Sequence, residues 1–180
     1  MAKESAVRKA FLSLALVLGC VFVTAGQPRP TAPRVVAQLK QIFPSAVGFS
    51  PKEGDPRHFK VFVGSGGGRQ VGGYAYFTTE LEPLERGYDG PIKVLVGMDT
   101  TGIIAGVIVV ENHEPYGSFS VETPQFAEQF RGKSIRDKFR VGKDIDAVSR
   151  ATISIASASR AVRNASRRMA RQMLTPDAVQ

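Results

Sequence analysis

The pattern of apolar and polar positions predicts a series of strands in the middle of the chain. Four runs rich in β-branched residues cover 59–63, 71–81, 92–99 and 103–110, and turn-forming residues separate them. Because consecutive strands usually pair with each other, we expect an antiparallel meander.

Helical spacing of apolar residues predicts three helices around these strands. Residues 34–43 form a short amphipathic helix that Pro44 ends, and residues 123–130 form another that Gly132 ends. From residue 155 to 174, apolar side chains recur every three or four positions, and arginines repeat likewise on another side. Strands in series with helices at both ends indicate an α+β fold, an antiparallel sheet with helices packed on one face.

The first 26 residues differ from the rest, because a basic start is followed by an apolar run. This segment is an export signal or an anchor, and three fates stay open: cleavage before Gly26, lipidation of Cys20, or retention as a single membrane anchor. In each case the positive-inside tendency places the domain in the periplasm or on the outer face of the cytoplasmic membrane. The chain then divides into residues 1–26, a linker at 27–33, one domain at 34–175 and a tail at 176–180.

Composition narrows the chemistry that the domain can perform. Cys20 is the only cysteine, so the exported domain has no disulfide and no thiolate metal site. His58 and His113 lack a second histidine at ligand spacing, and no hydrolase motif is present, so neither a metal nor catalytic residues are predicted.

Charge adds a second feature to the last predicted helix. The net charge is +8, and five arginines crowd this helix, a face suited to lipid headgroups or an acidic partner. Export argues against nucleic acid as the partner. The arginines are Arg160, Arg163, Arg167, Arg168 and Arg171.

Residues 146–154 place several hydroxyls and one acid where this last helix begins. A helix start exposes unpaired backbone N–H groups, which favour anionic ligands such as phosphate. The same residues also fit an ordinary helix start, with Ser149 as the cap and Thr152 reaching solvent. The local chemistry alone leaves both interpretations open.

The order of motifs along the chain favours the phosphate interpretation. Residues 87–99 begin Gly-Tyr-Asp-Gly-Pro, residues 102–110 form an apolar run, and His-Glu-Pro at 113–115 precedes the 146–154 segment. This order resembles the FMN-binding domain family, which includes flavin subunits of the Rnf and Na⁺-translocating NADH:quinone oxidoreductase complexes. The resemblance covers most of residues 43–173 and is closest to the exported N-terminal domain of NosR/NirI-type proteins.

The resemblance implies a covalently attached cofactor. The family links FMN through its phosphate to a threonine, in a pattern that Asp146, Ser149, Ala151 and Thr152 match. Thr152 is then the attachment site, and an ApbE-type flavin transferase makes the phosphoester from FAD. Arg150 stands where the family pattern prefers glycine, which tolerates a left-handed backbone better than arginine does.

Further contacts to FMN are implied at both ends of the cofactor. Ser149 and Ser154 are the expected hydrogen-bond donors to the phosphate near the helix start, together with Arg150. By resemblance, the ring environment comprises Tyr88, His113 and Glu114.

The function that the resemblance implies is electron transfer. The protein would hold and expose FMN and carry electrons to or from a membrane redox partner, as a component of a larger assembly rather than a self-contained enzyme. The alternative is a non-redox accessory or sensory module that keeps the fold and has lost the flavin through Arg150.

Overall fold

The computed structural model describes residues 31–64 and 68–175. The predicted export segment, the linker up to residue 30 and the predicted tail lie outside these residues. Within the two described ranges, no helix is both long enough and apolar enough to cross a bilayer.

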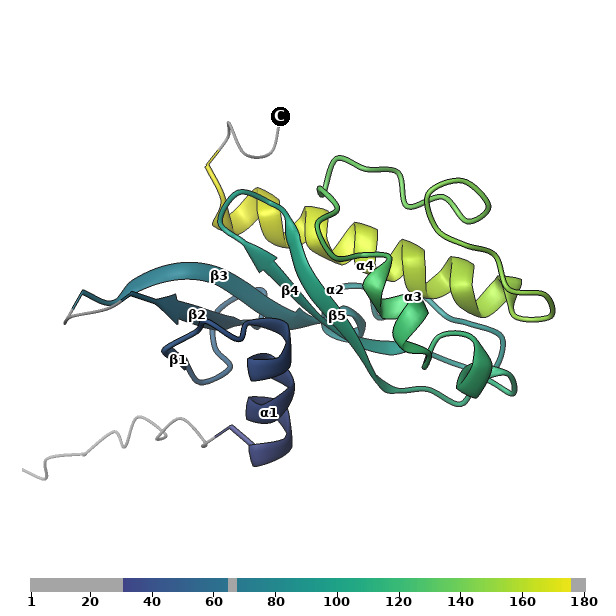
Figure 1. Cartoon of the computed structure of the whole chain (residues 1–180), viewed down its shortest axis with the longest axis horizontal. Helices are drawn as coiled ribbons and strands as arrows, with labels where there is room; N and C mark the ends of the chain where they lie inside the picture. Colours follow the sequence, from purple (N-terminus) through teal and green to yellow (C-terminus); the bar gives the residue numbers. More distant parts are fainter. Residues whose placement is uncertain (1–30, 65–67, 176–180) are drawn as a thin grey trace, which may run out of the picture.

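Five strands form one antiparallel sheet in which each strand pairs with its neighbours in the chain (Figure 1). The α+β class and the predicted meander are confirmed, and a strand of two residues, β1, is added at one edge. The strands are β1 (Gly48–Phe49), β2 (Phe59–Val63), β3 (Gln70–Phe77), β4 (Lys93–Asp99) and β5 (Ile104–Glu111).

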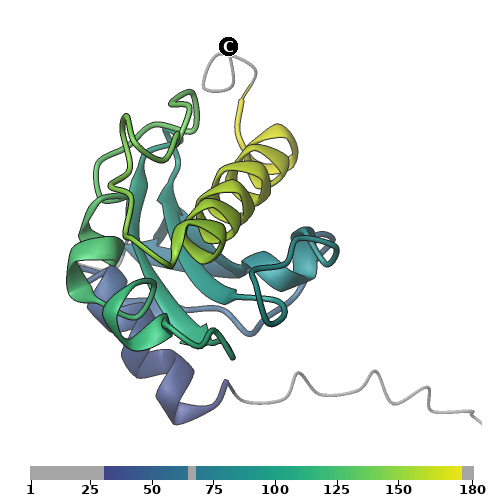
Figure 2. The ribbon, with the colours of Figure 1, turned by 90° about the vertical axis from the view of Figure 1, so that its right-hand side faces the viewer.

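Helices cover both faces of the sheet (Figure 2). Helix α1 (Pro33–Ile42) packs in one core cluster with Leu95, and α4 (Thr152–Met173) packs in the other with Val94 and Val96. The expectation that helices lie on one face was wrong. Val94, Leu95 and Val96 are fully buried, and successive side chains of a strand point to opposite faces of the sheet. This strand therefore needs cover on both faces, as its unbroken apolar run indicates.

The second predicted strand ends earlier than expected. It stops at Phe77, and the next four residues form the short helix α2 (Thr78–Leu81). The Thr78 hydroxyl donates to the Ile92 carbonyl at 3.3 Å and accepts from the Val94 N–H at 3.0 Å. The Thr78 side chain thus hydrogen-bonds the backbone at the start of β4, while its own backbone begins helix α2. Side-chain bonds to the backbone compete with strand formation in this way, and β-propensity alone does not predict them.

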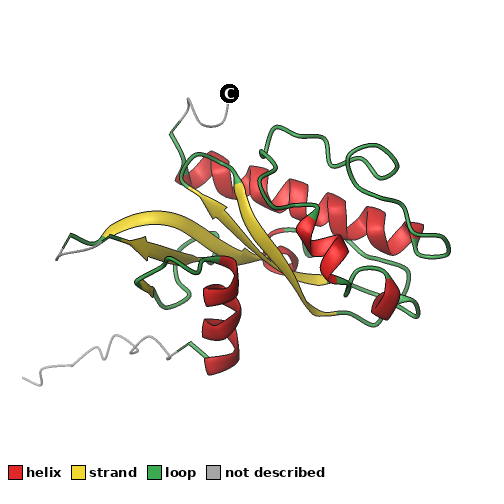
Figure 3. Ribbon diagram, viewed as in Figure 1, coloured by secondary structure: helices red, strands yellow, loops and turns green. Residues whose placement is uncertain are grey.

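A long segment without regular elements connects the short helix α3 (Pro124–Glu128) to α4 and lies beside α4 (Figure 3). The predicted helix at 123–130 is present in shortened form, and the Thr123 hydroxyl caps it by accepting from the Phe126 N–H at 3.2 Å. The segment is anchored by Phe139, whose buried ring packs edge-on against Phe130 with centroids 5.6 Å apart.

Arginines of α4 fasten neighbouring segments to the helix. Arg167 donates hydrogen bonds to three successive carbonyls, those of residues 135–137, at 2.8, 3.3 and 2.9 Å. Arg168 donates to the Leu81 carbonyl at 2.8 Å, and Arg163 donates to the Lys138 carbonyl at 3.2 Å. Part of the predicted basic face therefore has a structural role.

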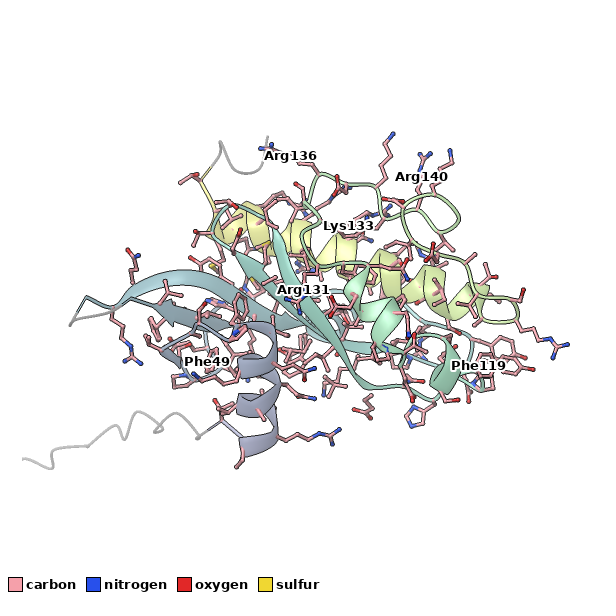
Figure 4. All side chains as sticks on the ribbon, in the orientation of Figure 1. Phe49, Phe119, Arg131, Lys133, Arg136 and Arg140 are labelled. Atoms are coloured by element: carbon pink, nitrogen blue, oxygen red, sulfur yellow. The ribbon has the colours of Figure 1, made fainter. Side chains whose placement is uncertain are left out.

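The residues that follow α3 cover one end of the β5 edge. Ile104 N–H donates to the Lys133 carbonyl at 2.8 Å, and Gly132 N–H donates back to the Ile104 carbonyl at 2.8 Å. The Arg131 guanidinium, labelled in Figure 4, adds a bond to the Ala105 carbonyl at 2.9 Å. The loop after α3 is thereby tied to the sheet.

Candidate functional site

A cavity of about 550 Å³ opens at the N-terminal end of α4. Its volume falls within the range of small-molecule and cofactor sites, roughly 300–1,000 Å³. Figure 4 labels Phe119 near this end of the molecule. The lining residues are Tyr88, Pro115, Tyr116, Arg150, Thr152, Ile153 and Ser154.

Thr152 is the first residue of α4, is exposed and lines the cavity. The residue at the cap position is Ala151, whose side chain makes no capping hydrogen bond. The interpretation of Ser149 as the cap was wrong. The first N–H groups of α4 are therefore free of a side-chain cap at the point where the Thr152 hydroxyl meets the cavity, which suits an anionic group.

The backbone conformation of Arg150 shapes the turn that leads into α4. The Ala151 N–H bonds to the Val148 carbonyl at 3.0 Å and closes a turn in which Arg150 is the third residue. Its φ is +68°, the left-handed conformation that glycine adopts without penalty and arginine adopts at a cost of roughly 1–2 kcal/mol. The chain thus keeps the backbone that the family's glycine favours, and places a guanidinium on the cavity wall.

Glu114 links two walls of the cavity from beneath. Its side chain is buried, and its carboxylate accepts from the Tyr88 N–H and the Asp89 N–H, each at 3.0 Å. The Ser154 hydroxyl donates to the same carboxylate. The loop that carries Tyr88 is thereby fixed to the first turn of α4.

The close approach of Glu114 requires a glycine at position 87. A Cβ atom there would lie 2.3 Å from Glu114 Oε1, well inside contact distance. The sequence shows this glycine at the start of the Gly-Tyr-Asp-Gly-Pro motif. Its requirement follows from the carboxylate behind it and not from the turn itself.

Aromatic and apolar side chains form the outer part of the cavity. Tyr88, Tyr116 and Ile153 line it and are 71%, 38% and 56% exposed. Phe119 packs against Tyr116, with ring centroids 5.3 Å apart. Such a wall suits a flat conjugated ring. Sequence reasoning found Tyr88 but missed Tyr116, whose only signal is its place directly after the His-Glu-Pro motif.

The structure does not bring all the predicted residues to the cavity. His113, Asp146 and Ser149 are outside the set of residues that line it, while Ala151 is buried in the core. Asp146 instead fixes its own segment, because its N–H donates to the Gln129 side-chain oxygen at 2.6 Å.

Comparison with known families matches the part of the chain that builds the cavity. Residues 87–167 match the family model described as "FMN-binding domain", and this range contains every residue that lines the cavity.

Two curated relatives are components of redox complexes. The chain is 28% identical over 103 residues to a subunit of the Na(+)-translocating ferredoxin:NAD(+) oxidoreductase complex of Acetobacterium woodii, covering 53% of this chain and 47% of the relative. It is 35% identical over 119 residues to a subunit of the ion-translocating oxidoreductase complex of Haemophilus influenzae, covering 61% of this chain and 54% of the relative. The chain thus spans about half the length of these relatives. The match over residues 87–167, together with these relatives, supports the FMN-binding domain family for this part of the chain and FMN as its cofactor.

Proposed function

We propose that the domain carries FMN as a phosphoester of Thr152 and serves as an electron carrier in a membrane-associated redox complex. One observation carries the proposal: the Thr152 hydroxyl is exposed on the wall of the cavity, at an α4 start without a side-chain cap. The phosphate would lie at the helix start beside Arg150, whose guanidinium suits a phosphate oxygen pair.

The attachment step would be the transfer of the FMN half of FAD to Thr152. The Thr152 oxygen loses its proton and bonds to the phosphorus of the FMN half, the bond between the two phosphates breaks, and AMP leaves. A threonine hydroxyl is a weak nucleophile, so the flavin transferase supplies the base and the metal. The chain's contribution is exposure of Thr152, next to Ala151, which is small and turned into the core.

The residues around the cavity would hold and orient the cofactor, which supplies the redox chemistry. Tyr88 and Tyr116 would contact the ring, and Glu114 fixes the loop that carries Tyr88. The named relatives are components of ion-translocating oxidoreductase complexes, which supports a membrane redox partner for this chain. The apolar N-terminal segment supports export of the domain or its tethering to the outer face of the cytoplasmic membrane.

The test is flavin fluorescence on a denaturing gel, after coexpression with a flavin transferase. We expect a fluorescent band for the wild type and Thr152→Ser, no band for Thr152→Val, and an unchanged band for Thr175→Val, a matched exposed threonine. Peptide mass spectrometry would locate the added FMN. A yellow protein whose colour is lost on denaturation would refute the phosphoester and leave FMN binding, whereas a colourless wild type would favour the non-redox module.

A further inference from the structure

A second, smaller cavity of about 260 Å³ lies along α4 and is rimmed by cations. Arg140 and Lys143 come from the loop beside the helix, and Arg160 and Arg163 come from α4 itself. Phe139, Val141 and Ala156 line the same cavity and are buried or half-buried, so they form its apolar floor. We call these seven residues the basic groove.

The charge of the basic groove is only partly neutralised. Arg160 forms an ion pair with Glu85 at 2.7 Å, and Arg163 donates to the Lys138 carbonyl. Among the residues that the structure describes, Arg140 and Lys143 form no ion pair. A concave surface lined by one sign of charge attracts ligands of the opposite sign.

The two unpaired cations stand on a rigid turn. The Arg140 carbonyl accepts from the N–H groups of Lys143, Asp144 and Ile145 at 3.1, 3.0 and 3.1 Å. The preceding residue, Phe139, has a φ of +47° and buries its ring in the core, which fixes where the turn begins. Figure 4 shows Arg140 on this loop beside α4, away from the strands. Cations that are held in place before binding lose little freedom when a ligand arrives.

The basic groove begins one helical turn from Thr152, the proposed FMN attachment site. Ala156 follows Thr152 by four residues on α4, so the two share a helix face and lie about 6 Å apart along the axis. We propose that the basic groove docks an acidic segment of the protein that exchanges electrons with the flavin. The redox part of this assignment rests on the proposed function, whereas the docking of an acidic segment does not.

The shape of the basic groove favours a protein over other anionic ligands. Exposed cations and less exposed apolar side chains line the same cavity, which suits an acidic side chain together with an apolar neighbour. A flat layer of lipid headgroups would meet the exposed cations but would not reach the apolar floor. A free phosphate would leave the apolar floor without a contact.

The test is binding of a fluorescein-labelled octaglutamate peptide, followed by fluorescence anisotropy at several salt concentrations. We expect Arg140→Glu/Lys143→Glu and Ala156→Glu each to weaken binding by about tenfold or more, and the salt dependence to become shallower. The matched control is Arg34→Glu/Arg57→Glu, which makes the same charge change at exposed positions away from the basic groove. Circular dichroism checks folding, and gel fluorescence of the same variants tests the proposed function separately.

Three results would overturn the proposal. Equal weakening by the control pair would show attraction by net charge alone. Binding to phosphatidylglycerol vesicles without peptide binding, lost in the same groove variants, would assign the surface to a membrane. Displacement of the peptide by inorganic phosphate, but not by chloride at equal ionic strength, would assign it to a small anion. Loss of peptide binding in the groove variants with unchanged flavin fluorescence would support the proposal.

Discussion

The buried carboxylate of Glu114 offers a sharp test of how the cavity at the start of α4 is held together. Glu114 Oε2 accepts from the Tyr88 N–H and the Ser154 hydroxyl, and Oε1 accepts from the Asp89 N–H. Glu114→Gln keeps the shape and one acceptor oxygen. The remaining oxygen can serve Tyr88 and Ser154 together, so the amide group then faces the Asp89 N–H and that bond is lost.

The structure sets the size of the effect. Losing one hydrogen bond to a charged acceptor in a buried position costs about 1.5–3 kcal/mol, so Glu114→Gln should lower the free energy of unfolding by about 2 kcal/mol. Glu114→Ala removes three such bonds, and relief of the buried charge offsets part of the loss, giving about 4 kcal/mol. Glu111→Gln is the control, because its carboxylate is exposed and 3.9 Å from Lys93 Nζ. It should change stability by less than about 0.5 kcal/mol.

Urea unfolding measures the free energies, and amide hydrogen exchange shows where the change occurs. In Glu114→Gln the Asp89 amide should exchange faster while the Tyr88 amide stays protected. In Glu114→Ala both should exchange faster. Equal stability of the Glu114→Gln and Glu111→Gln variants, or unchanged exchange at Asp89, would refute the assigned hydrogen bonds.

Three further predictions concern the backbone, a buried phenol and the helix arginines. Arg150→Gly should raise the free energy of unfolding by about 0.5–1 kcal/mol in urea, because relief of the left-handed strain exceeds the entropy cost of glycine; a loss of stability would contradict the strain. Burial raises the pKa of Tyr76, and the hydrogen bond to Ser166 offsets only part of this increase. The neutral Tyr76 side chain therefore contributes its full stability at pH values below the unfolded-state pKa, near 10. As the pH rises above that value toward the raised folded-state pKa, this stability is lost by about 1.4 kcal/mol per pH unit. The free energy of unfolding of the wild type minus that of Tyr76→Phe should stay constant from pH 8 to about 10 and fall with this slope from about pH 10 to 11. Parallel curves above pH 10 would contradict the prediction. Arg167→Ala should destabilise by about 2 kcal/mol and speed amide exchange in residues 135–145, whereas Arg171→Ala, which removes an exposed arginine, should do neither.

The strands and long helices were predictable because their patterns repeat over many residues. β4 and β5 show runs of apolar and β-branched residues, and α4 shows apolar spacing over about six turns, which matches its 22 residues. The sequence of β4 also indicates helices on both faces of the sheet, because Val94, Leu95 and Val96 follow one another without a polar residue. Alternation would have been required for a sheet with one exposed face.

The details of the cavity depend on information that the sequence does not display. Thr152 and Arg150 were found through the motif, but the φ of Arg150 decides that Ala151, not Ser149, stands at the cap position of the helix. The inward direction of Glu114 likewise depends on Gly87 being close behind it in space. Such contacts join residues far apart in the chain, and local propensity carries no record of them.

The two edges of the sheet also bear on how copies of the domain behave when they are crowded. An exposed strand edge can template pairing with another chain, which leads to aggregation. In the described part of the chain, β1 offers an edge of only two residues, and Ile104 and Ala105 of β5 are already engaged by the loop after α3. Intermolecular strand addition is therefore expected at the rest of β5, residues 106–111, and the loop that engages the start of this strand also carries Arg140 and Lys143 of the basic groove.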